Sequence, residues 1–537
     1  MPLPQPAADQ INPLPFPPDP ARRVRHLTLF LLTAASAAIR FLFLARKPFW
    51  FDECFSVEVA RLDWRNFLHL LWWREANMSL YYLLLRIWLH FGRSEFFIRT
   101  LSVLVAAATL PAIYWLARLL YNRRVALIAA TLFTFNAYSV RYAQEARSYE
   151  LLVLLATLSS GFLVAWVREY VREYVREFVR EPARSNRLEY VLCSVLAVYA
   201  HLYALLLLAA QWLAVGQFGS SAGRPDPLKH SGAPLAAQLR RAWIIIGLAV
   251  LPLLVFAAKT GAGPIRWIPR PDLRDVLEFY EHLAGGSNWA LLIAYAAACT
   301  AALLPAGKQL WTRPQSWETW RVHFLLVWLF FPVALTFLLS FARPVFLARY
   351  MIFCLPALLI LVAAGLARLR HSWLLAAALG GVLLLAAQGV FFVYGHDFDN
   401  ERDSSVAAAA FILDHAQPED AVIFHIAETR IPYEFVRSLH AGENSASPNF
   451  TAQLGPQILF PQHGAGLDYR DFTGKPTADF LRAATPGYPR MWIMLMNNGP
   501  AGRPDPTTGM LAQILAESFP KMARWQFAKV EVRLYSK

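Results

Sequence analysis

Charged residues are scarce in this chain. Of its 537 residues, 16% are Asp, Glu, Lys or Arg and 57% are hydrophobic, whereas soluble globular proteins average about 25% charged and about 45–50% apolar residues. The mean hydropathy is +0.36. This composition is not that of an ordinary soluble enzyme, and it indicates a protein that crosses a membrane several times.

Cysteine is also scarce. The four cysteines lie far apart with no CxxC spacing, at Cys54, Cys193, Cys299 and Cys354. Their spacing matches no cysteine-based metal site and argues against a disulfide framework. The formal net charge is +14, but no run of Lys and Arg is interleaved with aromatic residues that would stack on bases. Nucleic acid is therefore not an expected partner, and basic residues in cytoplasmic loops explain the excess charge better.

A cleavable signal peptide is not evident either. Residues 1–24 are rich in proline, which predicts a disordered cytoplasmic N-terminus. Arg22, Arg23 and Arg25 then precede an apolar run without a small-residue cleavage site. We therefore expect this run to be the first transmembrane helix.

Long apolar runs predict about eleven transmembrane helices, since about 17–25 apolar residues span the hydrocarbon core. The runs lie near 27–44, 97–119, 125–141, 149–167, 188–200, 202–218, 242–258, 289–305, 322–341, 349–367 and 373–393. Basic residues fall in alternate loops, which should be cytoplasmic. The outer side of the membrane then holds 45–96, 142–148, His201, 259–288, 342–348 and everything after 394. In the first of these loops, Ser79–Phe91 predicts a helix along the membrane surface.

The composition changes after Tyr394. Residues 395–537 contain charges, Pro and Gly at the frequencies of a soluble protein. A helix-like segment at Ser404–His415 is followed by strand-like segments at Ala421–Ile426, Met491–Met496 and Phe527–Tyr535. We predict a small periplasmic α/β domain over 395–537 that acts as a lid or recognises an acceptor.

Polar residues recur at the predicted outer ends of the spans. Phe49–Glu53 places two adjacent carboxylates behind three aromatic residues, at the level of a bilayer where aromatic rings collect. The turn at 142–149, YAQEARSY, gathers acidic, amide, basic and aromatic side chains in eight residues. The candidate site residues are Asp52, Glu53, Glu75, Asn77, Gln144, Glu145, Arg147, Tyr149, His201, Arg349 and Tyr350, with Arg40 inside the first span.

Simpler interpretations of some of these residues stay open. Asp52 and Glu53 are equally consistent with solvated loop acids, and His201 with a hydrogen bond between helices. Arg40 and Arg349 are consistent with long side chains that reach the membrane surface. Nevertheless, carboxylates beside arginines on one side of a membrane suit a substrate with an anionic head and an apolar tail. Arginine clamps phosphate and a carboxylate can deprotonate a hydroxyl, as sugar transfer from a lipid phosphate requires.

The chain resembles bacterial glycosyltransferase family 39 over roughly residues 25–395. The resemblance rests on WFDE, NMSLYYLLLRIW, the long stretch from SEFFIRT to QEARSYELL, AHLYALLLLAAQ and FLARYMIFCLPALLIL. Members are similar to protein O-mannosyltransferases and lipid A aminoarabinose transferases and have the GT-C fold. The resemblance implies a polytopic α-helical GT-C catalytic domain over 25–394, polyprenyl-phosphate sugar donors and inversion of the anomeric carbon.

The same resemblance implies roles for individual residues. Asp52 corresponds to the family's general base, with Glu53 as its usual neighbour, and Gln144–Arg147 corresponds to a Gln-Glu-Ala-Arg turn. Arg349-Tyr350 corresponds to an Arg-Tyr pair; Arg147 and Arg349, with His201, would hold the departing phosphate. The chain departs from the family at Asn77-Met78-Ser79, where many relatives have His-Pro-Pro, and it lacks a Lys of the aminoarabinose transferases. Asp, Glu and His can bind a divalent metal, but no spacing here demands one.

The expected function is transfer of a monosaccharide from a polyprenyl-phosphate donor to a glycolipid, glycan or protein hydroxyl. It would take place at the outer face of a bacterial cytoplasmic membrane. An alternative is a transporter or flippase of lipid-linked sugars, which predicts polar residues through the membrane midplane and broken helices in two repeats. The candidate charges instead cluster toward one face, and no repeat is evident. A third alternative, an inert scaffold, predicts that Asp52 is dispensable.

Overall fold

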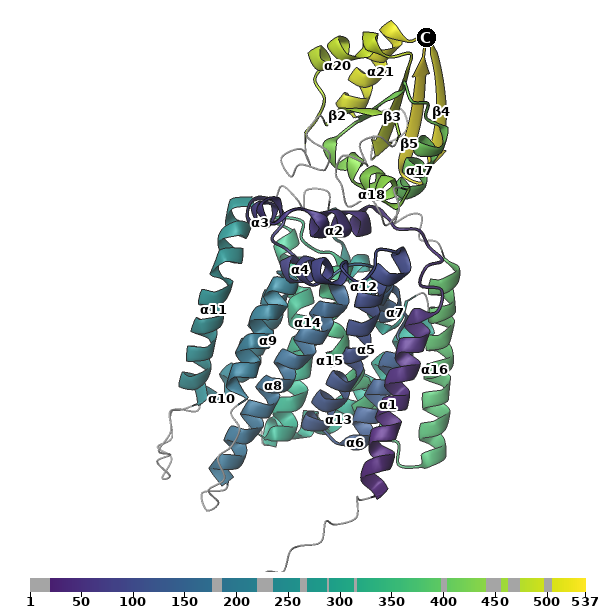
Figure 1. Ribbon diagram of the computed structural model, residues 1–537. Helices are drawn as coiled ribbons and strands as arrows, with labels where there is room; N and C mark the ends of the chain where they lie inside the picture. Colours follow the sequence, from purple (N-terminus) through teal and green to yellow (C-terminus); the bar gives the residue numbers. More distant parts are fainter. Residues whose placement is uncertain are drawn as a thin grey trace, which may run out of the picture.

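Apolar helices standing side by side form a block, and an α/β domain lies beyond one of its ends (Figure 1). The computed structural model describes residues 20–175, 186–219, 235–260, 268–286, 289–312, 316–396, 403–440, 455–461, 474–496 and 505–537. The predicted disordered segment 1–24 therefore lies almost wholly outside the described residues.

The helices of the block are α1 (Pro20–Phe41), α5 (Glu95–Leu120), α6 (Arg123–Thr134), α7 (Ala137–Ala143), α8 (Tyr149–Val175), α9 (Arg187–Ala200), α10 (Ala204–Gly219), α11 (Leu235–Thr260), α13 (Trp289–Thr312), α14 (Trp317–Ser340), α15 (Leu355–Leu366) and α16 (Ser372–Gly395). Each predicted apolar run falls on one of them or on a helix and its short neighbour. Among the described residues, six spans are long and apolar enough to cross a membrane, and a bent helix pair would make a seventh. Membrane helices are thus confirmed, while the number eleven stays a prediction.

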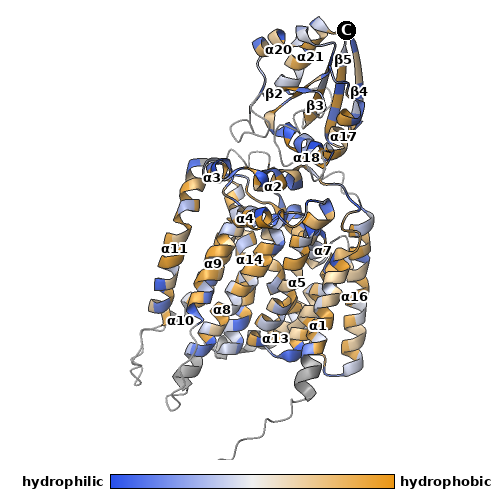
Figure 2. Ribbon diagram, in the orientation of Figure 1, coloured by the Kyte–Doolittle hydropathy of each residue, from blue (hydrophilic) through white to orange (hydrophobic). Residues whose placement is uncertain are grey.

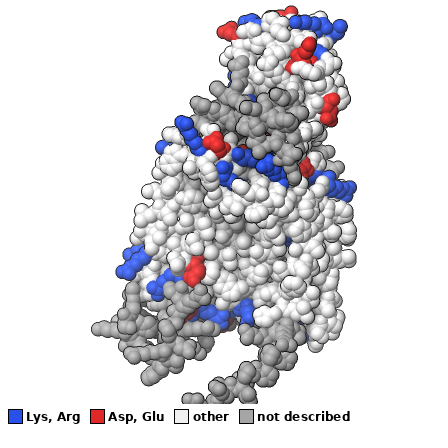
Figure 3. All heavy atoms as spheres, in the orientation of Figure 1, with Lys and Arg blue, Asp and Glu red and all other residues white. Residues whose placement is uncertain are grey.

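The surface of the block matches a membrane environment. Hydrophobic residues line the middle of its helices, and hydrophilic residues gather toward their ends (Figure 2). In the space-filling view, Lys and Arg form a belt at each end, with a band nearly free of charge between them (Figure 3). An apolar band flanked by charged belts is the pattern expected of a protein in a bilayer.

α15 forms the centre of the block, since every residue from Leu355 to Leu366 is buried. A helix that is apolar on all sides is stable only when its neighbours cover it completely. At Gly365 a Cβ atom would come within 1.8 Å of the Ala298 carbonyl oxygen, so this glycine lets α13 and α15 approach closely. The 3-10 helix η2 (Ala348–Cys354) leads into α15 and carries Arg349 and Tyr350.

A layer of short helices lies at the end of the block nearest the C-terminal domain (Figure 1). It contains α2 (Phe51–Arg61), α3 (Trp64–Trp73), α4 (Ser79–Trp88) and α12 (Leu273–Ala284). α4 occupies the position of the predicted surface helix. α12 was not predicted, although its first turn has a capping box in which Asp272 and Asp275 satisfy each other's backbone N–H groups.

The C-terminal domain contains one five-stranded sheet in the order β2-β1-β3-β5-β4. β1 (Ala421–Phe424) pairs in parallel with β2 (Gln457–Phe460) and β3 (Arg490–Met496), whereas β5 (Val530–Ser536) is antiparallel to β3 and β4 (Lys521–Phe527). The helices are α17 (Ser405–His415), α18 (Arg430–His440), α20 (Ala478–Ala484) and α21 (Pro506–Ser518). The strand predicted over Phe527–Tyr535 corresponds mainly to β5, and its first residues form the end of β4 and a turn at Lys529, which has a φ of 58°.

Candidate active site

Asp52 lies in the first turn of α2, where a negative side chain is favoured by the helix dipole. Its Oδ2 atom is 3.7 Å from Nη2 of Arg147 and 3.7 Å from Nη2 of Arg349. Within the described part of the chain, Oδ2 accepts no hydrogen bond, and the side chain is 21% exposed. Asp52 Oδ2 is therefore an enclosed carboxylate oxygen close to two cations, in a side chain that is itself partly exposed.

Arg147 and Arg349 reach Asp52 from different elements. Arg147 follows the turn after α7, and its Nη1 donates to the Asp52 carbonyl oxygen and to Ser56 Oγ, both at 3.3 Å. The Arg349 guanidinium lies 5.7 Å from the ring centres of Trp50 and of Tyr350. The side chains of Arg147 and Arg349 are only 8% and 19% exposed, respectively. Two largely enclosed guanidinium groups thus converge on one carboxylate.

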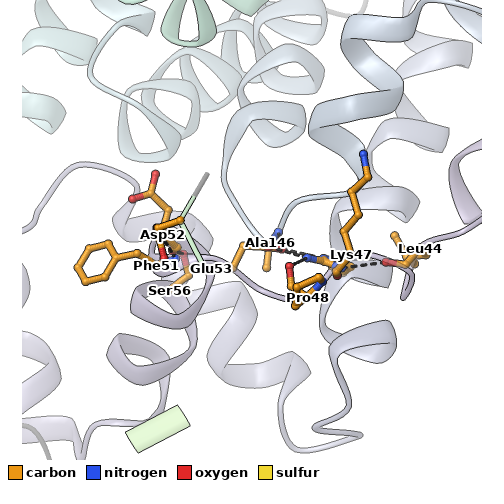
Figure 4. A network of polar contacts seen from close by, with 10 residues as sticks. Leu44, Lys47, Pro48, Phe51, Asp52, Glu53, Ser56 and Ala146 are labelled. Atoms are coloured by element: carbon orange, nitrogen blue, oxygen red, sulfur yellow. Dashed lines mark hydrogen bonds and ion pairs between the residues drawn. The ribbon is translucent and has the colours of Figure 1, made fainter. Parts of the chain in front are cut away.

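Glu53 points into a different environment from Asp52 (Figure 4). It is fully buried, and its oxygens accept hydrogen bonds from Arg99 Nε at 2.8 Å, Arg99 Nη2 at 2.6 Å and the Ala146 N–H at 2.9 Å. Arg99 also donates to the Leu44 and Lys47 carbonyl oxygens. Glu53 was predicted as a site residue beside Asp52, and these contacts tie α2 to α5 and to the turn before α8.

Aromatic rings border the arginines. The His201 ring lies 4.5 Å from the Tyr350 ring, and the Tyr149 and Tyr350 rings are 6.4 Å apart. His201 Nδ1 accepts the Tyr203 N–H at 3.2 Å, while its Nε2 has no hydrogen-bond partner among the residues described. Asn77 accepts the Leu202 N–H at 2.9 Å, which fixes the chain between α9 and α10. The structure therefore places His201, Tyr149 and Tyr350 together, with Asn77 in support.

Glu75 is a second carboxylate near Asp52. It lies half-buried between α3 and α4. Burial raises the pKa of Glu75 to about 7; the Arg147 charge opposes this shift and the Asp52 charge adds to it. A carboxyl group with a pKa near 7 can change its protonation state at physiological pH, which is typical of functional sites.

The prediction that Arg40 and Gln144 belong to this site is not supported by their contacts. Arg40 is buried between helices and donates to Ser36, to Ser139 Oγ at 2.9 Å and to the Phe133 carbonyl at 3.1 Å. Gln144 donates to the Arg40 and Leu42 carbonyls at the end of α1. Because carbonyl and hydroxyl oxygens accept hydrogen bonds from the Nη atoms of Arg40 and from Gln144, both residues hold α1 in place. Arg40 is fully buried, so it does not reach the membrane surface either.

Glu145 and Arg99 lie beside the site residues described so far. Glu145 is buried on the side of the turn where its charge interacts with Arg99. Arg99 was not predicted as a candidate, although a basic residue at the start of an apolar span is a visible signal for a buried ion pair. In the part of the chain that the structure describes, no group of three or more His, Cys, Asp or Glu side chains is arranged to hold a metal.

Comparisons with known proteins identify the fold. No protein-family model and no curated protein matches the chain. The fold is nevertheless shared with solved structures that align along nearly the whole chain. The structure is similar to ArnT from Cupriavidus metallidurans in the apo state, with a TM-score of 0.58 and 12% identity over 95% of this chain and 98% of that chain.

Two more solved structures are similar to this chain. The complex of the same ArnT with undecaprenyl phosphate has a TM-score of 0.55 and 12% identity over 94% of this chain and 97% of that chain. The oligosaccharyltransferase AglB from Archaeoglobus fulgidus, in complex with an inhibitory peptide and a dolichol-phosphate, has a TM-score of 0.48 and 11% identity over 88% of this chain and 70% of that chain. At this identity the similarity to ArnT establishes a shared fold.

Proposed function

We propose that this protein transfers a monosaccharide from a polyprenyl-phosphate donor to a hydroxyl acceptor at the outer face of a bacterial cytoplasmic membrane. The observation that carries the proposal is the convergence of Arg147 and Arg349 on Asp52 at one end of an apolar helical block. A structure with the same fold contains undecaprenyl phosphate, which supports a lipid phosphate as the donor.

The proposed reaction uses these three residues in one displacement. Asp52 Oδ2 accepts the proton of the acceptor hydroxyl, whose oxygen attacks the anomeric carbon of the donor. The bond from that carbon to the phosphate oxygen breaks, and the anomeric configuration inverts. The polyprenyl phosphate leaves with the bonding electrons, and the guanidinium groups of Arg147 and Arg349 stabilise its charge with paired hydrogen bonds.

The position of the charges argues against a transporter or flippase. Asp52, Arg147 and Arg349 lie together around the start of α2, a helix at the end of the block that faces the α/β domain (Figure 1). A transporter would need polar groups near the membrane midplane. The direct test is mass analysis of membrane glycolipids and glycoproteins from cells with and without the protein. Identical profiles would contradict the proposal.

The first prediction concerns Arg147 and Arg349, the two arginines proposed to bind the donor phosphate. Arg147→Ala and Arg349→Ala should each weaken binding of undecaprenyl phosphate by at least about tenfold, because each removes charge-assisted hydrogen bonds. The Lys variants keep the charge but lose the planar fork, so they should fall between Ala and wild type. Binding of the purified variants measured by calorimetry checks this. Arg482→Ala, on the far side of the α/β domain, is the control, and unchanged binding in both site variants would remove the two arginines from the donor site.

Membrane topology gives the second prediction. We propose that 25–394 is the membrane-embedded catalytic domain and that 395–537 lies in the periplasm, since the basic loops favour a cytoplasmic N-terminus. Alkaline phosphatase fused after Lys537 should therefore be active. The same reporter inserted between Arg368 and His371, in a predicted cytoplasmic loop, should be inactive. The reverse pattern would overturn this orientation.

A further inference from the structure

The α/β domain is docked on α2, the helix that carries Asp52. The Phe435 ring of α18 stacks on Phe49 at 5.1 Å, and Arg61 donates to Ser438 Oγ at 2.7 Å. The N–H of Phe51, the first residue of α2, donates to Asp403 Oδ2 at 3.2 Å. Asp403 Oδ1 also accepts the N–H of Ser405 in α17. One carboxylate therefore links the start of α2 to the start of the α/β domain.

This docking brings Glu428 toward Asp52. Glu428 belongs to η3 (Ala427–Thr429), the short turn between the carboxyl end of β1 and α18. Its side chain is half-buried, and within the described residues it makes no hydrogen bond and no ion pair. Its charge interacts with that of Asp52. Among the residues described, Glu428 is thus a carboxylate without a hydrogen-bonding partner whose charge acts on another carboxylate.

Neighbouring charges do not neutralise Glu428. On α18, Glu434 pairs with Arg430 and with Arg437, both at 2.5 Å, and Arg430 also donates to the Pro461 carbonyl. Burial, together with the Asp52 charge, raises the pKa of Glu428 to about 7. On the opposite side, Arg147 and Arg349 are turned to Asp52, and Glu75 adds another negative group.

We propose that Glu428 is a substrate-binding residue which the α/β domain adds to the site, and that it hydrogen-bonds hydroxyl or amino groups of the acceptor. A carboxylate that is half-buried and has no partner among the described residues loses part of its hydration, and a ligand that donates hydrogen bonds would replace what is lost. An ionised carboxylate only accepts hydrogen bonds. The donor phosphate is assigned to Arg147 and Arg349 and the acceptor hydroxyl to Asp52; because Glu428 interacts with Asp52 and comes from the α/β domain, we assign the group that it contacts to the acceptor.

This inference rests on the proposed function, and its kinetic test compares Glu428→Gln and Glu428→Ala with wild type. Purified protein is given an undecaprenyl-phosphate sugar, and the acceptor is titrated as an envelope extract from cells lacking the protein. The apparent KM for the extract should rise about tenfold or more in both variants, while binding of undecaprenyl phosphate stays unchanged. The wild-type KM should fall as the pH rises through about 7 and Glu428 ionises; this fall should be smaller in Glu428→Gln, where Glu75 still titrates in this range.

Glu517→Gln, exposed on α21 of the same domain, is the matched control and should behave as wild type in every assay. An unchanged KM and an unchanged pH profile in the Glu428 variants of an active enzyme would overturn the inference while leaving the proposed transferase intact. If wild-type protein transfers no sugar from any polyprenyl phosphate, the proposed function falls instead.

A stability measurement tests the placement of Glu428 without activity. Because its pKa is higher in the folded state than in the unfolded state, wild type should lose stability as the pH rises from about 4.5 to about 7. Glu428→Gln lacks this loss. Its melting temperature should exceed that of wild type at pH 8.5, and the difference should shrink toward pH 4.5. A difference that does not change with pH would contradict the enclosed position of this carboxylate.

Discussion

Asp52→Asn should slow sugar transfer by at least about a hundredfold, because loss of a general base costs about 10²–10⁴ in rate. Asn has nearly the shape of Asp but cannot take the proton of the acceptor hydroxyl. The variant should fold, insert and bind undecaprenyl phosphate, since Arg147 keeps its contacts with the Asp52 carbonyl and with Ser56. Single-turnover transfer from an undecaprenyl-phosphate sugar measures the chemical step directly.

The control for this prediction is Asp414→Asn, a change of the same type at an exposed position on α17, which should leave the rate unchanged. A normal rate in Asp52→Asn would show that α2 does not carry the catalytic centre and would favour an inert scaffold or a transporter. If the variant also loses donor binding, Asp52 acts mainly by positioning the two arginines. Rate and binding therefore have to be measured on the same preparation.

Hydropathy was sufficient to predict where the membrane helices lie. Each predicted run falls on a helix. In lipid, backbone polar groups must be hydrogen-bonded within the segment, so a membrane span is a helix with a long run of apolar side chains. α12 was missed because it is short and lies in a loop between two apolar runs. The hairpin at Lys529 was missed because the predicted segment began at Phe527, the last residue of β4, and so left the rest of that strand out.

The direction of a side chain within a helix was harder to predict. Asp52 and Glu53 are adjacent, so a helix points them about 100° apart, yet the sequence alone does not say which one faces the core. Only the packed structure shows that Arg99 and the Ala146 N–H surround Glu53. The contacts of Arg40 were hidden for a similar reason, because its depth in a span does not reveal the carbonyl and hydroxyl oxygens that surround it.

Residues that meet through domain docking left no local signal. Asp403 contacts the Phe51 N–H across 352 positions of sequence, and Glu428 approaches Asp52 only because α18 packs on α2. Family resemblance indicated Asp52, Arg147 and Arg349, since these positions lie in recognisable motifs of the membrane block. The segment after residue 395 has no such motif, so its contribution to the site becomes visible only in three dimensions.

Breaking the Glu53–Arg99 pair should destabilise the protein by about 3–5 kcal/mol, because removing one partner leaves a buried charge without compensation. Both side chains are at most 1% exposed, and Arg99 Nη2 lies 2.6 Å from Glu53 Oε2. Glu53→Gln leaves Arg99 charged, and Arg99→Leu leaves Glu53 charged and the Leu44 and Lys47 carbonyls without their donor. Chemical unfolding in detergent, followed by Trp fluorescence, measures the loss.

The double variant Glu53→Gln/Arg99→Leu separates the charge from the rest of the network. Removing both charges should recover part of the stability lost in Arg99→Leu. It should not recover all of it, because the Leu44 and Lys47 carbonyls still lack their donor and the Ala146 N–H donates to a neutral amide instead of a carboxylate. The exposed pair Arg274–Glu278 is the matched control; breaking it should change stability by less than about 1 kcal/mol. Folded Glu53→Gln protein should still transfer sugar, since Asp52 is intact. If it is stable but inactive while Asp52→Asn is fully active, the two carboxylates exchange roles and Glu53 is the base.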